Sequence, residues 1–391
     1  MSANNSLPII NSATVMINSL AQQKMAAGVK VYNLSAGEPH LPPHKQVVAA
    51  TLAVLEQGKI FYPPVAGLPE LKQLAAQWMN DSYQCQYKTQ NCLVVNGGKF
   101  GLYLLLQLLL QPQDEVIIAA PYWVSYPAIT QIFAGNPVIV PTTPGNGWKL
   151  TLANIKKAYT DKTRILLLNS GTNPTGAVYS RRELAAILKF AAQHDLLVIS
   201  DEVYSGLTYQ DDLYVSCGSF PEYQDRVIVI QSCSKNFSMT GWRIGFVFAA
   251  ENLISQLTSL VSQSTSGVAK VSQCAAIAVL AKAKQVNTWV RRAMHKRRDV
   301  LLSALNTYFK ISVDPPIAGL YVFISLKELG IKKMGSPEFC RLALEQANVA
   351  LVPGEAFGKE GFVRFSFGVQ ERDLKEGVKA LAQFCTKLSV G

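Results

Sequence analysis

The sequence predicts an α/β protein with two domains, a large one built on a mostly parallel sheet and a smaller one of α+β type. A chain of 391 residues is too long for one simple core and suits two domains. Through its middle, short apolar runs alternate with helical patterns, which indicates a parallel sheet covered by helices. The pattern changes near residue 286. We expect residues 45–290 to form the large domain, and residues 1–44 together with 291–391 to form the small domain.

Each strand expected in the large domain is a short, almost continuous apolar run, which is typical of strands buried on both faces. These runs cover residues 93–95, 115–119, 137–141, 164–168, 196–199, 226–230 and 244–249. Helices are expected between them, notably at 98–110, 124–133 and 181–193. The small domain is expected to contain a long charged helix at 286–308, a strand at 319–325, a helix at 337–348, a strand at 363–367 and a last helix at 371–388.

The composition, with 49% hydrophobic and 16% charged residues, indicates an ordered globular protein. The net charge is +11, which could attract a nucleic acid, a membrane surface or an anionic substrate. The densest basic stretch lies in the expected helix 286–308 and has no interleaved aromatic residues, so we interpret it as a solvated helix face. The most apolar stretch, 101–110, is too short to cross a bilayer. We therefore expect neither nucleic-acid nor membrane partners.

The cysteines and histidines predict no metal site. The seven cysteines include no pair with C-x-x-C spacing, which makes a zinc or redox motif improbable, and a reducing cytoplasm suits them best. His40 and His44 are interpreted as surface or loop residues rather than metal ligands.

The chemistry is expected just after the strands, because ligands of open α/β sheets bind at the carboxyl ends of the strands. Ser232 and Ser234 precede Lys235 there, and Arg243 follows eight residues later. Hydroxyls and a guanidinium suit a phosphate, and a lysine with a lowered pKa forms a Schiff base with a carbonyl. On spacing alone, an ordinary surface lysine is an equally good interpretation of Lys235.

Other strand ends carry further candidates. Asp201 follows an apolar strand, where it either pairs with a pyridinium nitrogen or caps the next helix. Tyr204 is either a packing residue or a donor to a phenolate oxygen, and Asn173 begins a turn that could hold its amide in the site. Gly97-Gly98-Lys99 offers backbone N–H groups to an anion but matches neither the G-x-x-x-x-G-K-[ST] nor the G-x-G-x-x-G motif. Arg364 is either a surface residue or a carboxylate ligand.

Taken together, these segments resemble the class I aminotransferases of fold type I, which use pyridoxal 5′-phosphate (PLP). The resemblance runs from about Asn11 to the C-terminus in motif order and rough spacing. The matching segments are Ser12 to Val15, Ala36-Gly37-Glu38-Pro39, Tyr62 with Gly67 to Leu71, Gly97-Gly98-Lys99, Pro121 to Pro127, Asn173 to Gly176, Asp201 to Tyr204, and Ser234-Lys235 with Gly241 to Gly245. Each segment alone is weak, but the ordered set is specific. It implies a seven-stranded large domain.

The resemblance also implies catalytic roles for Lys235, Asp201 and Tyr204. Lys235 would form the internal aldimine and shuttle a proton, and Asp201 would pair with the pyridine nitrogen. Tyr204 and Asn173 would bind the ring oxygen, and Trp123 would stack on the ring. The cofactor phosphate would be bound by Gly98, Lys99, Ser232, Ser234 and Arg243.

The substrate and the second subunit are implied in the same way. Arg364 would bind the α-carboxylate beside the Gly37 backbone, with Trp123 and Asn173 also at the substrate. Tyr62 would reach the cofactor of a neighbouring subunit, so a homodimer with shared active sites is expected. In the bacterial branch that this chain resembles more closely, the lysine of Gly-Gly-Lys holds the distal carboxylate, and Lys99 matches it. The alternative is that Lys99 supplies only its backbone N–H.

The implied reaction is ping-pong transamination, with L-aspartate and 2-oxoglutarate giving oxaloacetate and L-glutamate. The alternatives on the same fold are an aminotransferase for aromatic amino acids, alanine or prephenate, or a carbon–sulfur lyase. A PLP-binding regulator is the least favoured alternative, since about ten residues precede Asn11 and leave no room for a DNA-binding domain. Two departures bear on the substrate: His40 to His44 replace the family's Asp-Phe-Asp-Thr-Pro, and Phe100 replaces a glutamine.

Overall fold

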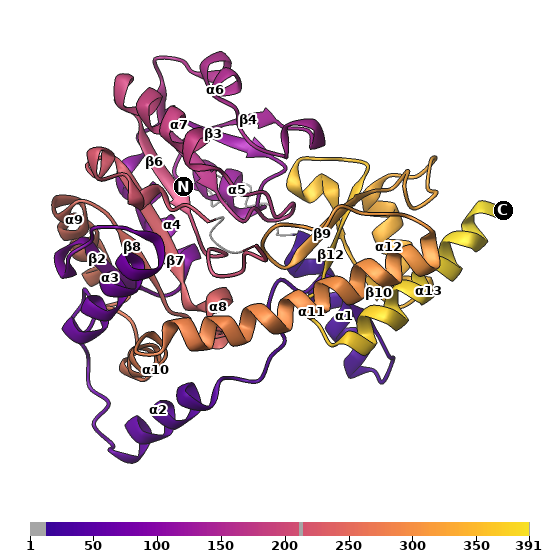
Figure 1. Cartoon of the computed structure of the whole chain (residues 1–391), viewed down its shortest axis with the longest axis horizontal. Coiled ribbons are helices and arrows are strands. Elements are labelled where there is room, and N and C mark those ends of the chain that lie inside the picture. The colour runs from indigo at the N-terminus through magenta and orange to yellow at the C-terminus, as the bar shows by residue number, and fades with distance from the viewer. Residues whose placement is uncertain (1–12, 211–213, 391) are drawn as a thin grey trace, which may run out of the picture.

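The computed structural model describes residues 13–210 and 214–390, so Ser12 of the first matching segment lies outside the described residues. A seven-stranded sheet forms the core of the larger part (Figure 1), in the order β2-β8-β7-β6-β5-β3-β4. Its strands are β2 (Cys92–Val95), β3 (Glu115–Ala120), β4 (Asn136–Pro141), β5 (Thr163–Asn169), β6 (Leu197–Asp201), β7 (Val227–Ser232) and β8 (Gly245–Phe248). Only β8 runs antiparallel to its neighbours, β2 and β7, which confirms the mostly parallel sheet.

Helices cover both faces of this sheet because alternate strand residues point to opposite sides. Val94 packs in one hydrophobic cluster, while its neighbours Leu93 and Val95 pack in the other. The first cluster includes side chains of α3 (Pro69–Tyr83), α7 (Arg181–Gln193) and α10 (Lys270–Leu280). The second includes side chains of α4 (Gly98–Leu109), α5 (Ser125–Ile132) and α9 (Glu251–Ser262). The short helix α6 (Leu152–Ala158) follows β4.

A second group of elements surrounds a three-stranded antiparallel sheet in the order β11-β12-β9. These strands are β9 (Tyr321–Ser325), β11 (Val352–Pro353) and β12 (Phe362–Ser366). Around them lie α1 (Ala13–Ala26), α12 (Ser336–Gln346), α13 (Glu371–Val390) and the parallel pair β1 (Tyr32–Asn33) and β10 (Val349–Ala350). The expected strands at 319–325 and 363–367 and helices at 337–348 and 371–388 are confirmed to within a few residues. The two-residue strands are too short to have a sequence signal.

The long helix α11 (Ala283–Phe309) runs across both groups of elements (Figure 1). Its Val286 packs against the cluster of the seven-stranded sheet, whereas Val290 and Leu301 pack in the cluster of the small sheet. Near the other end of the chain, Leu34 belongs to the small-sheet cluster and Val47 to the large-sheet cluster. We propose on this basis that the two domains divide near residues 44/45 and 290/291.

The helix α2 (Lys45–Glu56) and the segment after it lie at the edge of the molecule (Figure 1). They expose a group of large apolar side chains, which we call the apolar edge: Val48, Leu52, Leu55, Ile60, Phe61 and Tyr62. Tyr62 is 93% exposed. Large exposed apolar patches are typical of interaction sites. Within the described part of the chain, no helix has the length and apolar character needed to span a membrane.

Candidate active site

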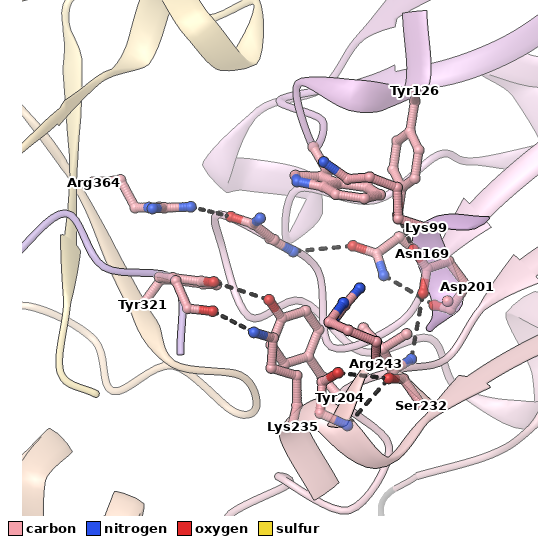
Figure 2. Close-up of a pocket in the computed structure, with 16 residues that line it drawn as sticks. Lys99, Tyr126, Asn169, Asp201, Tyr204, Ser232, Lys235, Arg243, Tyr321 and Arg364 are labelled. Carbon is pink, nitrogen blue, oxygen red and sulfur yellow. Dashed lines mark hydrogen bonds between the residues drawn. The ribbon is translucent and has the colours of Figure 1, made fainter. Parts of the chain in front are cut away.

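One pocket contains all of the predicted site residues except Tyr62 (Figure 2). It lies where strands of the seven-stranded sheet end and faces the small sheet. Asn169, Asp201 and Ser232 are the last residues of β5, β6 and β7. Parallel strands bring their carboxyl ends to one edge, so these residues meet although they are far apart in the sequence. Arg364 reaches the same pocket from β12.

One end of the pocket is built for an anion. Helix α4 begins at Gly98 without a side chain that caps its first N–H groups, and the N-terminus of a helix attracts negative charge. Ser232 Oγ donates to Ser234 Oγ at 3.0 Å, and the Arg243 guanidinium lies beside Gly97. A Cβ atom on Gly97 would meet Arg243 Nη2 at 2.6 Å, and Gly97 has a φ of +85°. Glycine is therefore required for the backbone and the guanidinium to form this cradle together.

Asp201 forms the floor of the pocket and is 5% exposed. Its carboxylate accepts hydrogen bonds from the Tyr126 hydroxyl at 2.6 Å and from the Val203 N–H at 3.3 Å. Burial nevertheless raises the pKa of Asp201 to about 6, because these donors do not fully replace water. A protonated ring nitrogen placed against the carboxylate would restore its charge.

Lys235 lies in the short helix α8 (Cys233–Asn236), and its Nζ donates to the carbonyl oxygen of Gly37. Burial lowers the pKa of Lys235 to about 8. Glu38 acts in the opposite direction, while Arg243, Arg364 and Lys99 lower the pKa further. A substantial share of neutral amine is therefore present near pH 8, and this is the form that attacks a carbonyl carbon.

Arg364 is 1% exposed, yet it takes part in no ion pair among the described residues. Its Nη1 donates to Asn173 Oδ1 at 2.9 Å and its Nη2 to the Ser35 carbonyl oxygen at 2.8 Å (Figure 2). Its Nε is buried and has no hydrogen-bond partner in the described structure. A buried guanidinium with an unused donor is suited to a carboxylate, which guanidinium groups bind bidentately.

Lys99 occupies the other side of the pocket, with its Nζ 4.8 Å from the centroid of the Trp123 ring. Burial lowers the pKa of Lys99, and the nearby Arg243 lowers it further. The Lys99 side chain thus lies inside the pocket and is available to a second carboxylate.

Four residues that line this pocket were not among the predicted site residues: Tyr126, Asn169, Val203 and Tyr321. Asn169 carries the same signal as Asp201, since both end a buried strand. Tyr126 lies on the first turn of α5, three residues after Trp123. No local signal marks Tyr321, whose position follows from strand pairing.

The segments that depart from the family pattern lie outside the pocket. His40 lies 3.6 Å from Glu38, and its hydrogen bond is the largest of the effects that lower the pKa of Glu38 to about 2. His44 is the N-cap of α2 and packs edge-to-face on Trp289. Phe100 stacks on Tyr103 along α4.

The fold and the pocket define a class of enzyme in which a buried amine lies between an anion cradle, a carboxylate and a free guanidinium. Residues 29–381 match the model of the family "Aminotransferase class I and II", so the chain belongs to this family. The aspartate aminotransferase of Bacillus subtilis is 34% identical over 97% of each chain. The probable aspartate/prephenate aminotransferase of Aquifex aeolicus is 36% identical over 95% of each. The Thermus thermophilus aspartate aminotransferase with maleate superposes with a TM-score of 0.90 at 33% identity, covering 96% of this chain and 97% of that one.

The family implies PLP, and the residues of the pocket fit it. The cradle at Gly97 and Arg243 suits the phosphate, because a Cβ atom would fill it. The buried Asp201 carboxylate suits a ring nitrogen, and the buried Lys235 amine suits an aldehyde. These three groups line the same pocket, as one molecule would require.

We expect Gly97→Ala to damage both stability and anion binding. The φ of +85° with a ψ of 160° is a backbone region open essentially only to glycine and costs another residue about 1–3 kcal/mol, and the added methyl group displaces Arg243. Thermal unfolding should show a lower Tm, and titration should show weaker binding of inorganic phosphate to the protein without cofactor. Gly241→Ala is the matched control, since a Cβ there meets nothing within 4 Å. Equal behaviour of the two variants would contradict the role assigned to the cradle.

Proposed function

We propose that this protein is a PLP-dependent aminotransferase that converts L-aspartate and 2-oxoglutarate into oxaloacetate and L-glutamate. The observation that carries the proposal is the position of Lys235. Its buried amine lies in one pocket with an anion cradle, the Asp201 carboxylate and an unpaired guanidinium. Relatives that cover almost the whole chain and are named aspartate aminotransferases support the choice of substrate.

Each residue has a distinct task in this proposal. Bound PLP supplies an aldehyde for the substrate amine and a ring that stabilises negative charge at the substrate Cα. Asp201 would keep the ring nitrogen of PLP protonated, and Tyr204 and Asn173 would donate hydrogen bonds to its ring oxygen. Lys235 would accept the Cα proton of the substrate on its amine and so act as the general base. Arg364 holds the α-carboxylate and so orients the Cα–H bond toward Lys235. An amino acid leaves as an oxo acid before the second substrate enters, which is ping-pong kinetics.

Lys99 is the residue to which we assign the distal carboxylate of aspartate. Its Nζ lies in the pocket on the Trp123 side, whereas Arg364 enters from β12. A dicarboxylate would therefore contact a cation at each end. Prephenate is the second candidate acceptor, because a 36% identical relative is named a probable aspartate/prephenate aminotransferase.

We also propose that the protein is a cytoplasmic homodimer with shared active sites. The apolar edge exposes six large apolar side chains, which suits an interface, and Tyr62 at its end lies outside the pocket of its own chain. If a second subunit covers this edge, the phosphate of its bound cofactor would lie near Tyr62. A subunit without its partner would then lack Tyr62 of the partner subunit as a phosphate ligand.

The first test is a half-reaction screen. PLP-loaded protein mixed with single amino acids should convert its cofactor to pyridoxamine phosphate fastest with aspartate and glutamate. In Lys235→Ala this conversion should fall by several orders of magnitude, while the exposed Lys189→Ala serves as the control. PLP capture by the protein without cofactor should accelerate as the pH rises through about 8, where Lys235 loses its proton. Full conversion by Lys235→Ala would overturn the mechanism.

Lys99→Ala tests the assignment of the distal carboxylate. Removal of one charge-assisted contact costs about 1.5–3 kcal/mol, which corresponds to a roughly 10- to 100-fold loss of kcat/KM for aspartate and glutamate. Alanine has no distal carboxylate and should react almost as before. An equal loss for all three substrates would show that the Lys99 side chain has no selective role.

A subunit-mixing experiment tests Tyr62. Tyr62→Ala should weaken PLP binding, and Lys235→Ala should be inactive. If Tyr62 acts across the interface, a mixed dimer of the two contains one complete site, with Lys235 from one subunit and Tyr62 from the other. Mixing should therefore restore wild-type PLP affinity to about half of the active sites that contain Lys235. A mixture of wild type with the double variant is the control. If mixing restores nothing although hybrids form, Tyr62 acts within its own subunit.

A further inference from the structure

Tyr321 is a pocket residue to which neither the proposed function nor the comparisons assign a role. It is 1% exposed and makes two contacts with residues of the site. Its hydroxyl lies 2.9 Å from the Tyr204 hydroxyl, and its ring lies 4.1 Å from the guanidinium carbon of Arg364 (Figure 2). Tyr321 therefore touches both the residue assigned to the ring oxygen and the residue assigned to the substrate carboxylate.

The pairing of two strands fixes this position. In the register of β9 and β12, Tyr321 lies opposite Ser366, and Phe323 lies opposite Arg364. Residues two apart on one strand share a face, so Tyr321 is the diagonal neighbour of Arg364 on the same face. A Cβ atom on Gly37 would meet the Tyr321 hydroxyl at 3.0 Å, which leaves the phenol little room to move away. The strand pairing and the nearby Gly37 backbone thus hold the Tyr321 hydroxyl against Tyr204.

The hydrogen bond between the two phenols has a direction that matters. If Tyr204 donated to Tyr321, its single proton would be used within the protein and none would remain for a ligand. If Tyr321 donates, the Tyr204 proton stays available for an acceptor in the pocket. The Arg364 cation on the face of the Tyr321 ring favours this second arrangement, because positive charge beside a phenol strengthens its O–H as a donor. Tyr204 is surrounded by Tyr321, Arg364 and Asp201, and burial raises its pKa well above the ordinary value, so it keeps its proton.

We propose that Tyr321 is a positioning residue that donates its hydroxyl proton to Tyr204 and thereby directs the Tyr204 proton into the pocket. The inference rests on the proposed function, in which that proton is donated to the ring oxygen of PLP. A donor that itself accepts a hydrogen bond is strengthened by it. Tyr321 thus stabilises negative charge on the ring oxygen without touching the cofactor.

The test follows the absorbance of bound PLP as a function of pH. This absorbance changes when the cofactor takes up a proton, and the ring oxygen shares in that protonation. A hydrogen bond from Tyr204 favours the deprotonated cofactor, so weakening this bond raises the pH midpoint of the absorbance change. Tyr321→Phe should raise the midpoint by about 0.5–1 pH unit, the equivalent of one ordinary hydrogen bond. It should lower kcat while leaving the KM for aspartate nearly unchanged, because the phenyl ring still covers Arg364.

A double-mutant cycle separates this role from a general effect on the pocket. Tyr204→Phe should raise the midpoint further than Tyr321→Phe, and the double variant should match Tyr204→Phe alone, since Tyr321 acts through Tyr204. Tyr209→Phe is the matched control, because its partly buried hydroxyl donates to the Gly319 carbonyl oxygen at 2.5 Å without reaching the pocket. It should leave the midpoint unchanged.

The outcomes distinguish the inference from the proposed function. An unchanged midpoint in Tyr321→Phe, or effects of Tyr321→Phe and Tyr204→Phe that add, would overturn the role of Tyr321 while wild type still binds PLP and transaminates. A wild-type protein that binds no PLP would instead overturn the proposed function.

Discussion

The convergence of four cations on one pocket is the constraint on which the rest of the site depends. Lys99, Lys235, Arg243 and Arg364 line the pocket, and Asp201 is the one carboxylate among the lining residues. Like charges repel most strongly where water is scarce. Burial is the largest cause of the lowered pKa of Lys235, and repulsion from Arg243, Arg364 and Lys99 lowers this pKa further. The neighbouring cations therefore add to the nucleophilicity of Lys235 and also attract anionic ligands to the pocket.

The scaffold holds these charges apart at fixed places. Arg243 and Lys235 are anchored to the large sheet, and Arg364 belongs to the small one. One link between the two parts is the hydrogen bond from Arg364 to Asn173, which follows β5. Asn173 in turn donates its backbone N–H to the Asn169 side chain, which donates to the carbonyl oxygen of Asp201. This chain of contacts orders the pocket before any ligand arrives, so binding loses less conformational freedom.

Much of this arrangement could be predicted from the sequence, because it follows from local patterns. Buried strands gave continuous apolar runs, and Asp201 and Ser232 stood out because polar residues end those runs. The position of Tyr321 depends on the register between strands some forty residues apart, which no local pattern encodes. Tyr62 was expected at the cofactor of a neighbouring subunit, and it lies outside the pocket of its own chain. His40 and His44 of the departing loop contact Glu38 and Trp289, contacts that the sequence did not predict.

The helix α11 has a consequence for how the molecule loses its structure. Its first turns pack in the core of the large sheet and its later turns in the core of the small sheet, without a break between them. If either core unfolds, α11 loses apolar contacts at one end while its other end remains packed in the other core. Unfolding of one part therefore destabilises the other directly, and the helix couples the two cores into a more cooperative unit than a flexible linker would allow.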